Sequence, residues 1–348
     1  MRLLITTQVV DIHDPILGFF HDWILEFSTR FDRIDVICLK EGVHTFPAHV
    51  HVHSLGKEKG KGRFTYTIRF FIYFFRFFIF SHTDFVLYHM GAVYNILGAP
   101  FFFLRKIRRT SFYWWKTHGH INIWGRIAGK LVDRVYTASD GSFPLPYTHK
   151  YVVGHGISIT NHDGMSGGIS EPLSIIVVGR ISPAKHVEIA IASAQLLREK
   201  GIAFKMQFVG AAVDPEYMRT MEALVQEYTL SETVAFIGTM DHGALTHAYT
   251  KCDFLLHPST TGGIDKVVLE AMQNGVFPIA LTATYAQLIP SHCCVPSLDP
   301  AEFVGAIERV RRLTDTERKI MREEMRATVI QNHSLATLTT RIFGDMTE

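Results

Sequence analysis

Short apolar runs alternate with amphipathic segments along most of the chain. In the first half, runs at residues 3–6, 34–39 and 85–87 have the length of buried strands, and residues 21–30 and 94–104 have helical spacing. The alternation restarts near residue 174 and continues to about residue 281. Strands that alternate with helices predict parallel sheets covered by helices on both faces. We therefore expect an α/β chain with two doubly wound, Rossmann-like sheets.

The two halves are joined by a segment dense in Gly, Ser and Asn at residues 154–168. Such a composition is typical of a linker. We place the first domain at residues 1–157, the linker at 158–172 and the second domain at 173–330. A length of 348 residues is that of about two ordinary domains.

Charge is divided unevenly between the halves, although the net charge of the chain is only +2. Residues 1–157 contain 19 basic and 11 acidic residues, and the remainder contains 16 basic and 22 acidic residues. The first half thus carries +8 and the second −6. A basic half predicts contact with an anionic partner, and its densest basic segments are residues 57–63 and 105–109.

Residues 64–80 contain eight phenylalanines. On a helix, Tyr66, Arg69, Tyr73 and Arg76 would form one polar stripe on an otherwise apolar cylinder. The run is too short, and too interrupted by Arg, to span a bilayer. Two interpretations remain: a helix buried in the core, and a helix that dips into an anionic membrane surface beside the basic loop. A helix with apolar residues on most of its sides is usually buried, so we favour the buried helix.

A strand, a turn and a helix are predicted in residues 252–275. The apolar run 252–257 predicts a strand, residues 258–263 are rich in Ser, Thr and Gly, and helical spacing begins near Ile264. The free backbone N–H groups of such a turn and the helix dipole attract an anion, most often a phosphate. Glu270 would then accept hydrogen bonds from the hydroxyls of an attached sugar. The alternative is that the turn only connects the strand to the helix and that Glu270 is a surface residue, because Gly-rich turns of this kind are common.

Two cations lie in a similar turn, where residues 179–185 read GRISPAK after a predicted strand. Arg can bind phosphate oxygens through two parallel hydrogen bonds, and Lys adds a point charge. Gly179, Arg180 and Lys185 therefore predict an anion site at the mouth of the sheet. A lysine that only faces solvent at a helix start is the alternative.

Histidines occur at two positions of interest. His118 lies where a predicted strand at 111–115 runs into a turn, which suits a ligand crevice, although such a histidine is more often structural. His49, His51 and His53 alternate with valines in a predicted half-buried strand. No carboxylate or thiolate lies nearby, so we favour a solvated strand face over a metal site.

The combination of motifs resembles the family 4 glycosyltransferases of the GT-B fold. It comprises GRxxxxK after a strand, FVG at 208–210, FIG at 236–238, and the PS…GG…EAM…G block at 258–275. The resemblance covers nearly the whole chain and is strongest at 173–283. It implies two Rossmann-like domains that face each other across a cleft. It also implies that the last helix, at 331–348, packs back on the first domain.

The resemblance implies roles for particular residues. Arg180 and Lys185 would bind the donor diphosphate, Glu270 the ribose, and residues 236–239 would lie by the base. The first domain would supply a Gly-containing loop with Gly18, and His118 near the transferred sugar. The implied catalytic residues are His118, Arg180, Lys185 and Glu270. The implied donor-binding residues are Gly18, Gly179, Arg180, Lys185, Gly210, Ile237, Gly238, Thr239, Gly262, Gly263, Ile264, Asp265 and Glu270.

One position departs from the family pattern. The family usually has a second Glu eight positions before Glu270, and this chain has Gly262 there. Asp265 and Lys266 also occupy the turn where many relatives carry Phe-Gly or Pro-Asn. Asp265 is therefore expected either to contact the donor sugar or to cap the helix that starts beside it.

The expected function is transfer of a hexose-type sugar from a nucleotide-diphosphate sugar to a glycan or lipid-linked acceptor, with retention of configuration. A sugar-nucleotide epimerase of the same fold, or a degenerate nucleotide-sugar-binding protein, is the alternative. A nicotinamide-dependent dehydrogenase is disfavoured because residues 3–18 lack GxGxxG. No metal or other cofactor is expected, since the two cations take the place of a divalent ion.

The expected partners are the nucleotide-sugar donor, the acceptor and, as the alternative interpretation of residues 64–80, an anionic membrane surface. No nucleic acid is expected. The four cysteines show no CxxC spacing, which suits a reducing cytosol, and the N-terminus does not have the pattern of a signal peptide. We expect a cytoplasmic protein; under the membrane interpretation of residues 64–80, it is peripheral on the inner face of the cytoplasmic membrane.

Overall fold

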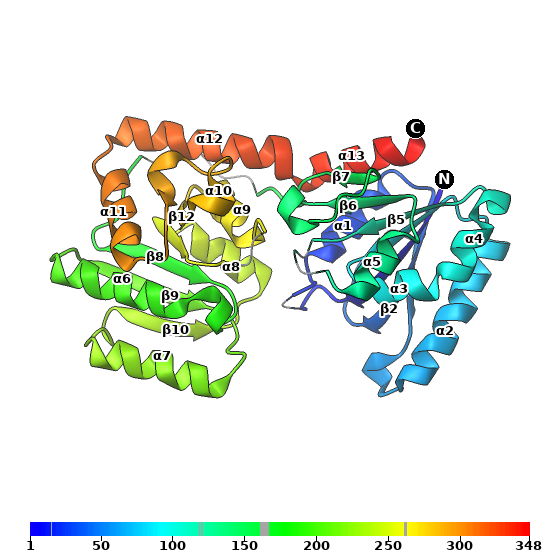
Figure 1. Ribbon diagram of the computed structural model, residues 1–348, viewed down its shortest axis with the longest axis horizontal. Coiled ribbons are helices and arrows are strands. Elements are labelled where there is room, and N and C mark those ends of the chain that lie inside the picture. The colour runs from blue at the N-terminus through cyan, green and yellow to red at the C-terminus, as the bar shows by residue number, and fades with distance from the viewer. Residues whose placement is uncertain (15, 118, 120, 161–166, 261–262) are drawn as a thin grey trace. The chain divides into compact units, whose positions relative to one another are not determined.

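The computed structural model describes residues 1–348 except residues 15, 118, 120, 161–166 and 261–262 (Figure 1). The chain divides into two compact units. The first contains Met1–Ser158 and Ser334–Glu348, and the second contains Ile159–His333. The first unit thus ends next to the domain boundary predicted at residue 157, and the rest of the predicted linker belongs to the second unit.

The first unit is built on a seven-stranded parallel sheet with the order β3-β2-β1-β4-β5-β6-β7. Its strands are β1 (Arg2–Val10), β2 (Arg33–Glu41), β3 (Val50–Ser54), β4 (Phe85–His89), β5 (Ser111–Trp115), β6 (Arg134–Thr137) and β7 (Lys150–Val152). Its α-helices are α1 (Phe20–Ser28), α2 (Arg63–Phe75), α3 (Ala92–Leu97), α4 (Ala99–Arg108), α5 (Ile123–Gly129) and α13 (Leu335–Thr347).

Side chains of β1 alternate between two hydrophobic cores, one on each face of this sheet. Leu3 and Ile5 pack with residues of α1 and α13, and Leu4 packs with phenylalanines of α2 and α4. This alternation follows from the period of two along a strand. Both faces of the first sheet are therefore covered by helices, as a doubly wound sheet requires.

The last helix, α13, packs on α1 within the first unit. The Phe343 and Phe31 rings lie 5.4 Å apart, and the Tyr136 hydroxyl donates to Asp345 Oδ2 at 2.7 Å. Leu338 and Ile342 are fully buried in the same core. These contacts tie the C-terminal segment to a sheet formed more than 180 residues earlier in the chain.

The second unit is built on a six-stranded parallel sheet with the order β10-β9-β8-β11-β12-β13. Its strands are β8 (Leu173–Val178), β9 (Phe204–Val209), β10 (Val234–Gly238), β11 (Phe254–His257), β12 (Phe277–Leu281) and β13 (Cys294–Val295). Its α-helices are α6 (Val187–Glu199), α7 (Pro215–Glu227), α8 (His242–Tyr249), α9 (Lys266–Gln273), α10 (Thr282–Tyr285), α11 (Pro300–Arg311) and α12 (Asp315–His333). Helix α6 contacts α7 and α11, and α9 contacts α8 and α12.

The structure corrects two expectations for the first unit and adds one helix. Residues 64–80 are not a wholly buried helix, because Phe64, Ile72 and Phe80 on α2 and the following π-turn (Arg76–Phe80) are exposed. The helix expected at 94–104 is two helices, α3 and α4. A side chain at Gly98, between them, would collide with the hydroxyl of Tyr88. The short helix α5 was not predicted.

Two of the three histidines around β3, His49 and His53, are not simply solvated. His53 Nε2 lies 3.2 Å from Asp35 Oδ1 and the ring packs near Phe77, and His49 Nε2 contacts the Ser28 carbonyl at 3.0 Å. In the part of the chain that the structure describes, no three His, Cys, Asp or Glu side chains are grouped to hold a metal ion. Within the same residues, no helix is long and apolar enough to cross a membrane.

Candidate functional site

The second sheet reverses its strand order between β8 and β11. From β8 the chain builds outward through β9 and β10, and it then returns to place β11 on the other side of β8. The carboxyl ends of such neighbouring strands leave a crevice between their diverging connections, where ligands of open α/β sheets bind. The GRISPAK turn follows β8 and the Gly-rich turn follows β11, so both predicted anion-binding turns meet at this point.

Lys185 and Asp265 join the two turns. Lys185 Nζ forms an ion pair with Asp265 Oδ2 and donates a hydrogen bond to Ser259 Oγ at 3.2 Å. The backbone N–H of Asp265 in turn donates to the Tyr285 hydroxyl at 3.1 Å, which also lies 3.4 Å from the Gly263 carbonyl. The Asp265 side chain makes no capping hydrogen bond to α9, so the expected capping role is wrong.

Asp265 stays ionised because of its neighbours. Burial opposes its ionisation, but the interactions with His257 and Lys185 outweigh burial and hold the pKa of this carboxyl well below its usual range. His257 Nε2 lies 3.0 Å from Asp265 Oδ2, although its N–H is not aligned for a hydrogen bond. Lys185 therefore faces a permanent carboxylate.

His257, at the end of β11, is fully buried, and burial lowers its pKa below the usual 6.5 despite the opposing effect of Asp265. A lowered folded-state pKa stabilises the fold above about 6.5, and this contribution is lost as the pH falls through the folded-state value. We expect His257→Gln to make the free energy of unfolding less dependent on pH between about pH 8 and about pH 5. Urea titrations at both pH values test this. The matched change at exposed His247, on α8, should leave the dependence unaltered.

Arg180 follows Gly179 directly after β8. Its side chain is exposed, and it forms no ion pair with any residue in the described ranges. A cation in this state is available to an anionic ligand at little cost, because no internal contact has to be broken first. The turn therefore offers one available cation, Arg180, and one neutralised cation, Lys185.

The backbone at the ends of β8 and β9 is packed too closely for side chains. Gly210 has φ of 152°, and a Cβ there would lie 1.9 Å from the Gly179 carbonyl oxygen. The Gly210 N–H donates to the Gly238 carbonyl at 2.8 Å, at the end of β10. The three predicted glycines thus lie beside one another along the carboxyl edge of the sheet.

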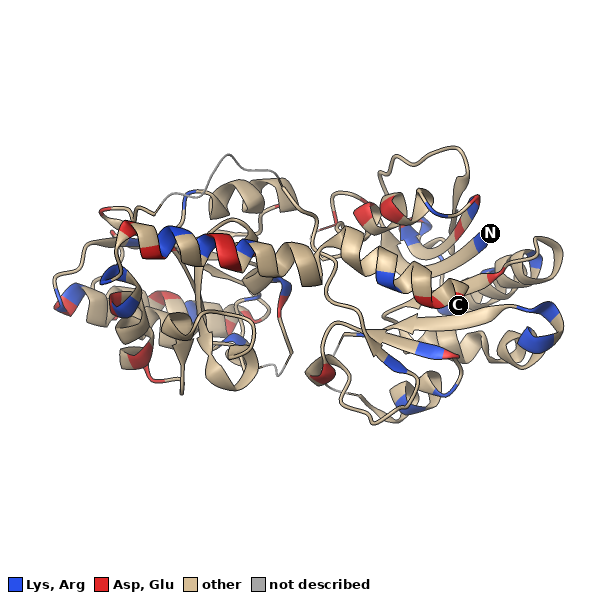
Figure 2. Ribbon diagram, turned by 90° about the horizontal axis from the view of Figure 1, so that it is seen from above, with Lys and Arg blue, Asp and Glu red and all other residues tan. Residues whose placement is uncertain are grey.

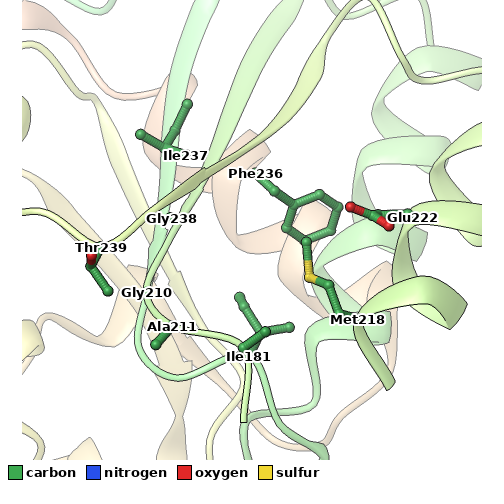
Figure 3. A pocket seen from close by; sticks show the side chains of 10 residues that line it. Ile181, Gly210, Ala211, Met218, Glu222, Phe236, Ile237, Gly238 and Thr239 are labelled. Atoms are coloured by element: carbon green, nitrogen blue, oxygen red, sulfur yellow. The ribbon is translucent and has the colours of Figure 1, made fainter. Parts of the chain in front are cut away.

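A pocket of about 460 Å³ opens at this edge (Figure 3). Its volume is within the range of small-ligand sites. Ile181, within the GRISPAK turn and adjacent to Arg180 in sequence, lines this pocket. Figure 3 shows Phe236, Met218 and Glu222 grouped on one side of the pocket. The lining residues are Ile181, Gly210, Ala211, Ala212, Met218, Glu222, Phe236, Ile237, Gly238 and Thr239.

Glu270 lies on α9, partly buried, near the end of α8. The hydroxyl of buried Tyr249 lies close to it: burial raises the pKa of Tyr249, and the charge of Glu270 adds to the effect. Glu270 thus lies within α9, and Asp265 immediately precedes the same helix.

The first unit places Gly18 between β1 and α1. The Gly18 N–H donates to the Asp14 carbonyl at 2.9 Å, and a Cβ would lie 2.7 Å from that oxygen, so only glycine fits this turn. His118 and Gly262 lie outside the described residues. Close to His118 in sequence, burial lowers the pKa of Lys116 at the end of β5.

Sequence reasoning did not identify Met218, Glu222, Ser259 or His257 as site residues. Met218 and Glu222 are four residues apart on α7, a spacing that marks one helix face but not which cavity it borders. Ser259 and His257 belong to the predicted strand–turn segment, but the sequence does not indicate their role. Only the fold shows that the Lys185 side chain contacts this segment.

Comparison with known proteins gives a family. Residues 164–326 match the family described as Glycosyl transferases group 1. Over 140 residues the chain is 29% identical to the putative colanic acid biosynthesis glycosyltransferase WcaL of Escherichia coli K12. The aligned segment covers 38% of this chain and 32% of WcaL. WcaL of Salmonella typhimurium is 28% identical over 117 residues. The match thus spans about a third of the length of these relatives.

Solved structures share the fold over nearly the whole chain. HepE of Anabaena, crystallised with UDP and glucose, superposes with a TM-score of 0.74 at 17% identity and full coverage of both chains. Sucrose-phosphate synthase of Thermosynechococcus elongatus gives 0.74 at 16% identity, covering 99% of each chain. The lipopolysaccharide outer core galactosyltransferase WaaB gives 0.70 at 15% identity, covering 99% of this chain and 100% of that one. The chain thus has the GT-B fold, and residues 164–326, most of its second unit, match the glycosyl transferases group 1 family.

Proposed function

We propose that this protein is a glycosyltransferase that moves a hexose-type sugar from a nucleotide-diphosphate sugar to a glycan or lipid-linked acceptor, with retention of configuration. The observation that carries the proposal is the meeting of Lys185, Asp265 and Ser259 where the strand order of the second sheet reverses. In this proposal the donor diphosphate replaces Asp265 as the partner of Lys185, and exposed Arg180 binds the same anion.

The pocket beside Arg180 then receives the nucleoside. Its walls at Phe236 and Met218 are apolar enough for a flat base, and the backbone at Gly238 and Thr239 offers polar groups at its edge. Glu270 binds the ribose hydroxyls in this arrangement. HepE was crystallised with UDP, which supports a uridine or related nucleotide as the donor.

The chemistry requires stabilisation of a leaving diphosphate. The bond from the anomeric carbon to the diphosphate oxygen breaks, the acceptor oxygen bonds to that carbon, and the acceptor hydroxyl loses its proton. Negative charge therefore grows on the diphosphate as the bond breaks. Arg180 and Lys185 would stabilise this charge by about 3 kcal/mol each, as fixed electrostatic donors do in other enzymes. No metal or cofactor is needed in this proposal. His118 is proposed to orient the sugar.

The proposed acceptor binds the first unit. Trp124, on α5 just beyond β5, is 57% exposed, and Ile123 beside it is also exposed. An exposed indole at the carboxyl end of a sheet can stack on a sugar ring, and the neighbouring apolar side chain suits a lipid-linked glycan. The names of WcaL and WaaB, which point to colanic acid and lipopolysaccharide synthesis, support such an acceptor.

A panel of nucleotide sugars tests the proposed function. We expect slow release of sugar from one donor without an acceptor, and a nucleoside diphosphate as the second product. Appearance of an epimeric nucleotide sugar would instead indicate the epimerase alternative. Binding of a donor without any turnover, with or without glycan acceptors, would indicate the degenerate binding protein.

Asp265→Asn is expected to raise affinity for the bare nucleoside diphosphate about fivefold, because the diphosphate no longer competes with a carboxylate for Lys185. This corresponds to about 1 kcal/mol, the upper end for a partly exposed ion pair. We also expect the ratio of hydrolysis rates for two sugars on one nucleotide to change, since Asp265 is freed toward the sugar once Lys185 binds phosphate. Calorimetry and product analysis measure the two effects. An unchanged ratio would leave Asp265 only as the partner of Lys185.

A further inference from the structure

The outward face of α2 is apolar. Phe64, Ile68, Ile72 and Phe75 are spaced four, four and three residues apart, and all four are exposed, with Phe64 at 80%. Phe80, at the end of the π-turn that continues the helix, is also exposed and lies 5.8 Å from Phe75, ring to ring. An amphipathic helix normally turns polar residues to solvent. Helix α2 therefore has two apolar sides, one in the core and one outside it.

The neighbouring helix α4 repeats this arrangement. Its exposed side chains include Phe103, Leu104 and Ile107, the last at 80%. Helix α4 packs on α2 through Phe101 and Phe74, whose rings lie 4.6 Å apart. Monomeric proteins seldom expose large apolar patches, and those they expose usually mark an interaction surface.

Basic residues border these helices. Residues 57–109 contain ten Lys and Arg but only two Asp and Glu. Lys57, Lys59 and Lys61 precede α2, and Lys106 and Arg109 end α4. All five are exposed, and none forms an ion pair with a residue that the structure describes. Figure 2 shows several basic residues at the end of this unit that lies farthest right in the view.

We propose that α2 and α4 form a docking face for an anionic lipid bilayer. The apolar side chains insert at the boundary between the headgroups and the acyl chains, and the cations contact the anionic headgroups. This face is the exposed apolar residues of both helices together with Lys57, Lys59, Lys61, Lys106 and Arg109. Apolar insertion and attraction to anionic lipids act together in helices that lie along a membrane surface. A second copy of the chain fits poorly, because pairing two such faces would bring their uncompensated cations together.

Vesicle sedimentation tests the proposal. We expect the protein to sediment with vesicles of phosphatidylcholine and phosphatidylglycerol at low salt, and much less with phosphatidylcholine alone. Replacing Lys57, Lys59 and Lys61 by Gln should weaken partitioning about a hundredfold, at about fivefold for each charge near the membrane surface. The triple variant Phe64→Ala, Ile72→Ala, Phe75→Ala should weaken it by about a hundredfold or more. All six side chains are exposed, and alanine preserves the helix propensity of α2, so both variants should keep the wild-type Tm.

The matched controls lie in the second unit. Val213→Ala with Ile320→Ala removes exposed apolar groups, and Arg219→Gln with Lys251→Gln removes exposed charges; neither should alter partitioning. Absence of sedimentation with the anionic vesicles would overturn the proposal. So would wild-type partitioning by the apolar triple variant. Self-association of the free protein that the same variant abolishes would assign the face to a second copy instead.

Discussion

Lys185→Ala is expected to lower affinity for the nucleoside diphosphate about a hundredfold, and Arg180→Ala about tenfold, while affinity for the plain nucleoside changes little. A hydrogen bond to a charged group is worth about 1.5–3 kcal/mol, which corresponds to roughly tenfold to a hundredfold. The larger loss falls on Lys185 because its removal also leaves the Asp265 carboxylate without the lysine countercharge, facing the incoming phosphates. Arg180 has no such partner among the described residues.

A double variant separates the two parts of the Lys185 effect. Lys185→Ala with Asp265→Asn removes both charges, so it should bind the diphosphate more tightly than Lys185→Ala alone and about as well as Arg180→Ala. Calorimetric titration of diphosphate and nucleoside into each variant measures this. Equal losses for diphosphate and nucleoside would show that Lys185 and Arg180 do not bind the phosphates.

Glu270→Gln is expected to lower affinity for the donor between about tenfold and a hundredfold. The amide still accepts one hydrogen bond from the ribose but lacks the charge that strengthens it. Because the ribose is present in both ligands, nucleoside and nucleoside diphosphate should lose affinity by the same factor, unlike the response to Lys185→Ala.

A glutamate elsewhere in the second unit provides the control for Glu270. Glu227→Gln, at the exposed end of α7, removes the same charge from the same unit without touching the predicted ribose site. Its affinities should match those of the wild type. A loss restricted to the diphosphate in Glu270→Gln would place Glu270 at the phosphates, and no loss would leave it as a partner of Tyr249 alone.

The fold was predictable because its signals are local. Runs such as residues 174–178 have the length and composition of buried parallel strands, and the Gly-rich turns mark where those strands end. Residues 64–80 were harder, because periodicity reports that a helix is apolar on several sides but not which sides are covered. Only the packing of Phe70 and Phe74 against the sheet leaves Phe64 and Ile72 exposed.

The site was predictable only in part. The motifs identified Arg180, Lys185, Gly210 and Gly238 as neighbours of one edge. The ion pair between Lys185 and Asp265 spans 80 residues, and no spacing rule relates positions so far apart. Met218 and Glu222 were not identified for the same reason. The sequence of α7 is that of an ordinary surface helix, and only the fold shows that these two residues line a pocket together with residues of β10.

The most direct test of the account follows one α-linked nucleotide sugar by NMR as the protein hydrolyses it or transfers the sugar. We expect the sugar first released, or bound to the acceptor, to be the α anomer. We also expect the rate to fall sharply in the Arg180→Ala, Lys185→Ala double variant. First appearance of the β anomer, or a double variant as fast as the wild type, would contradict the proposed mechanism.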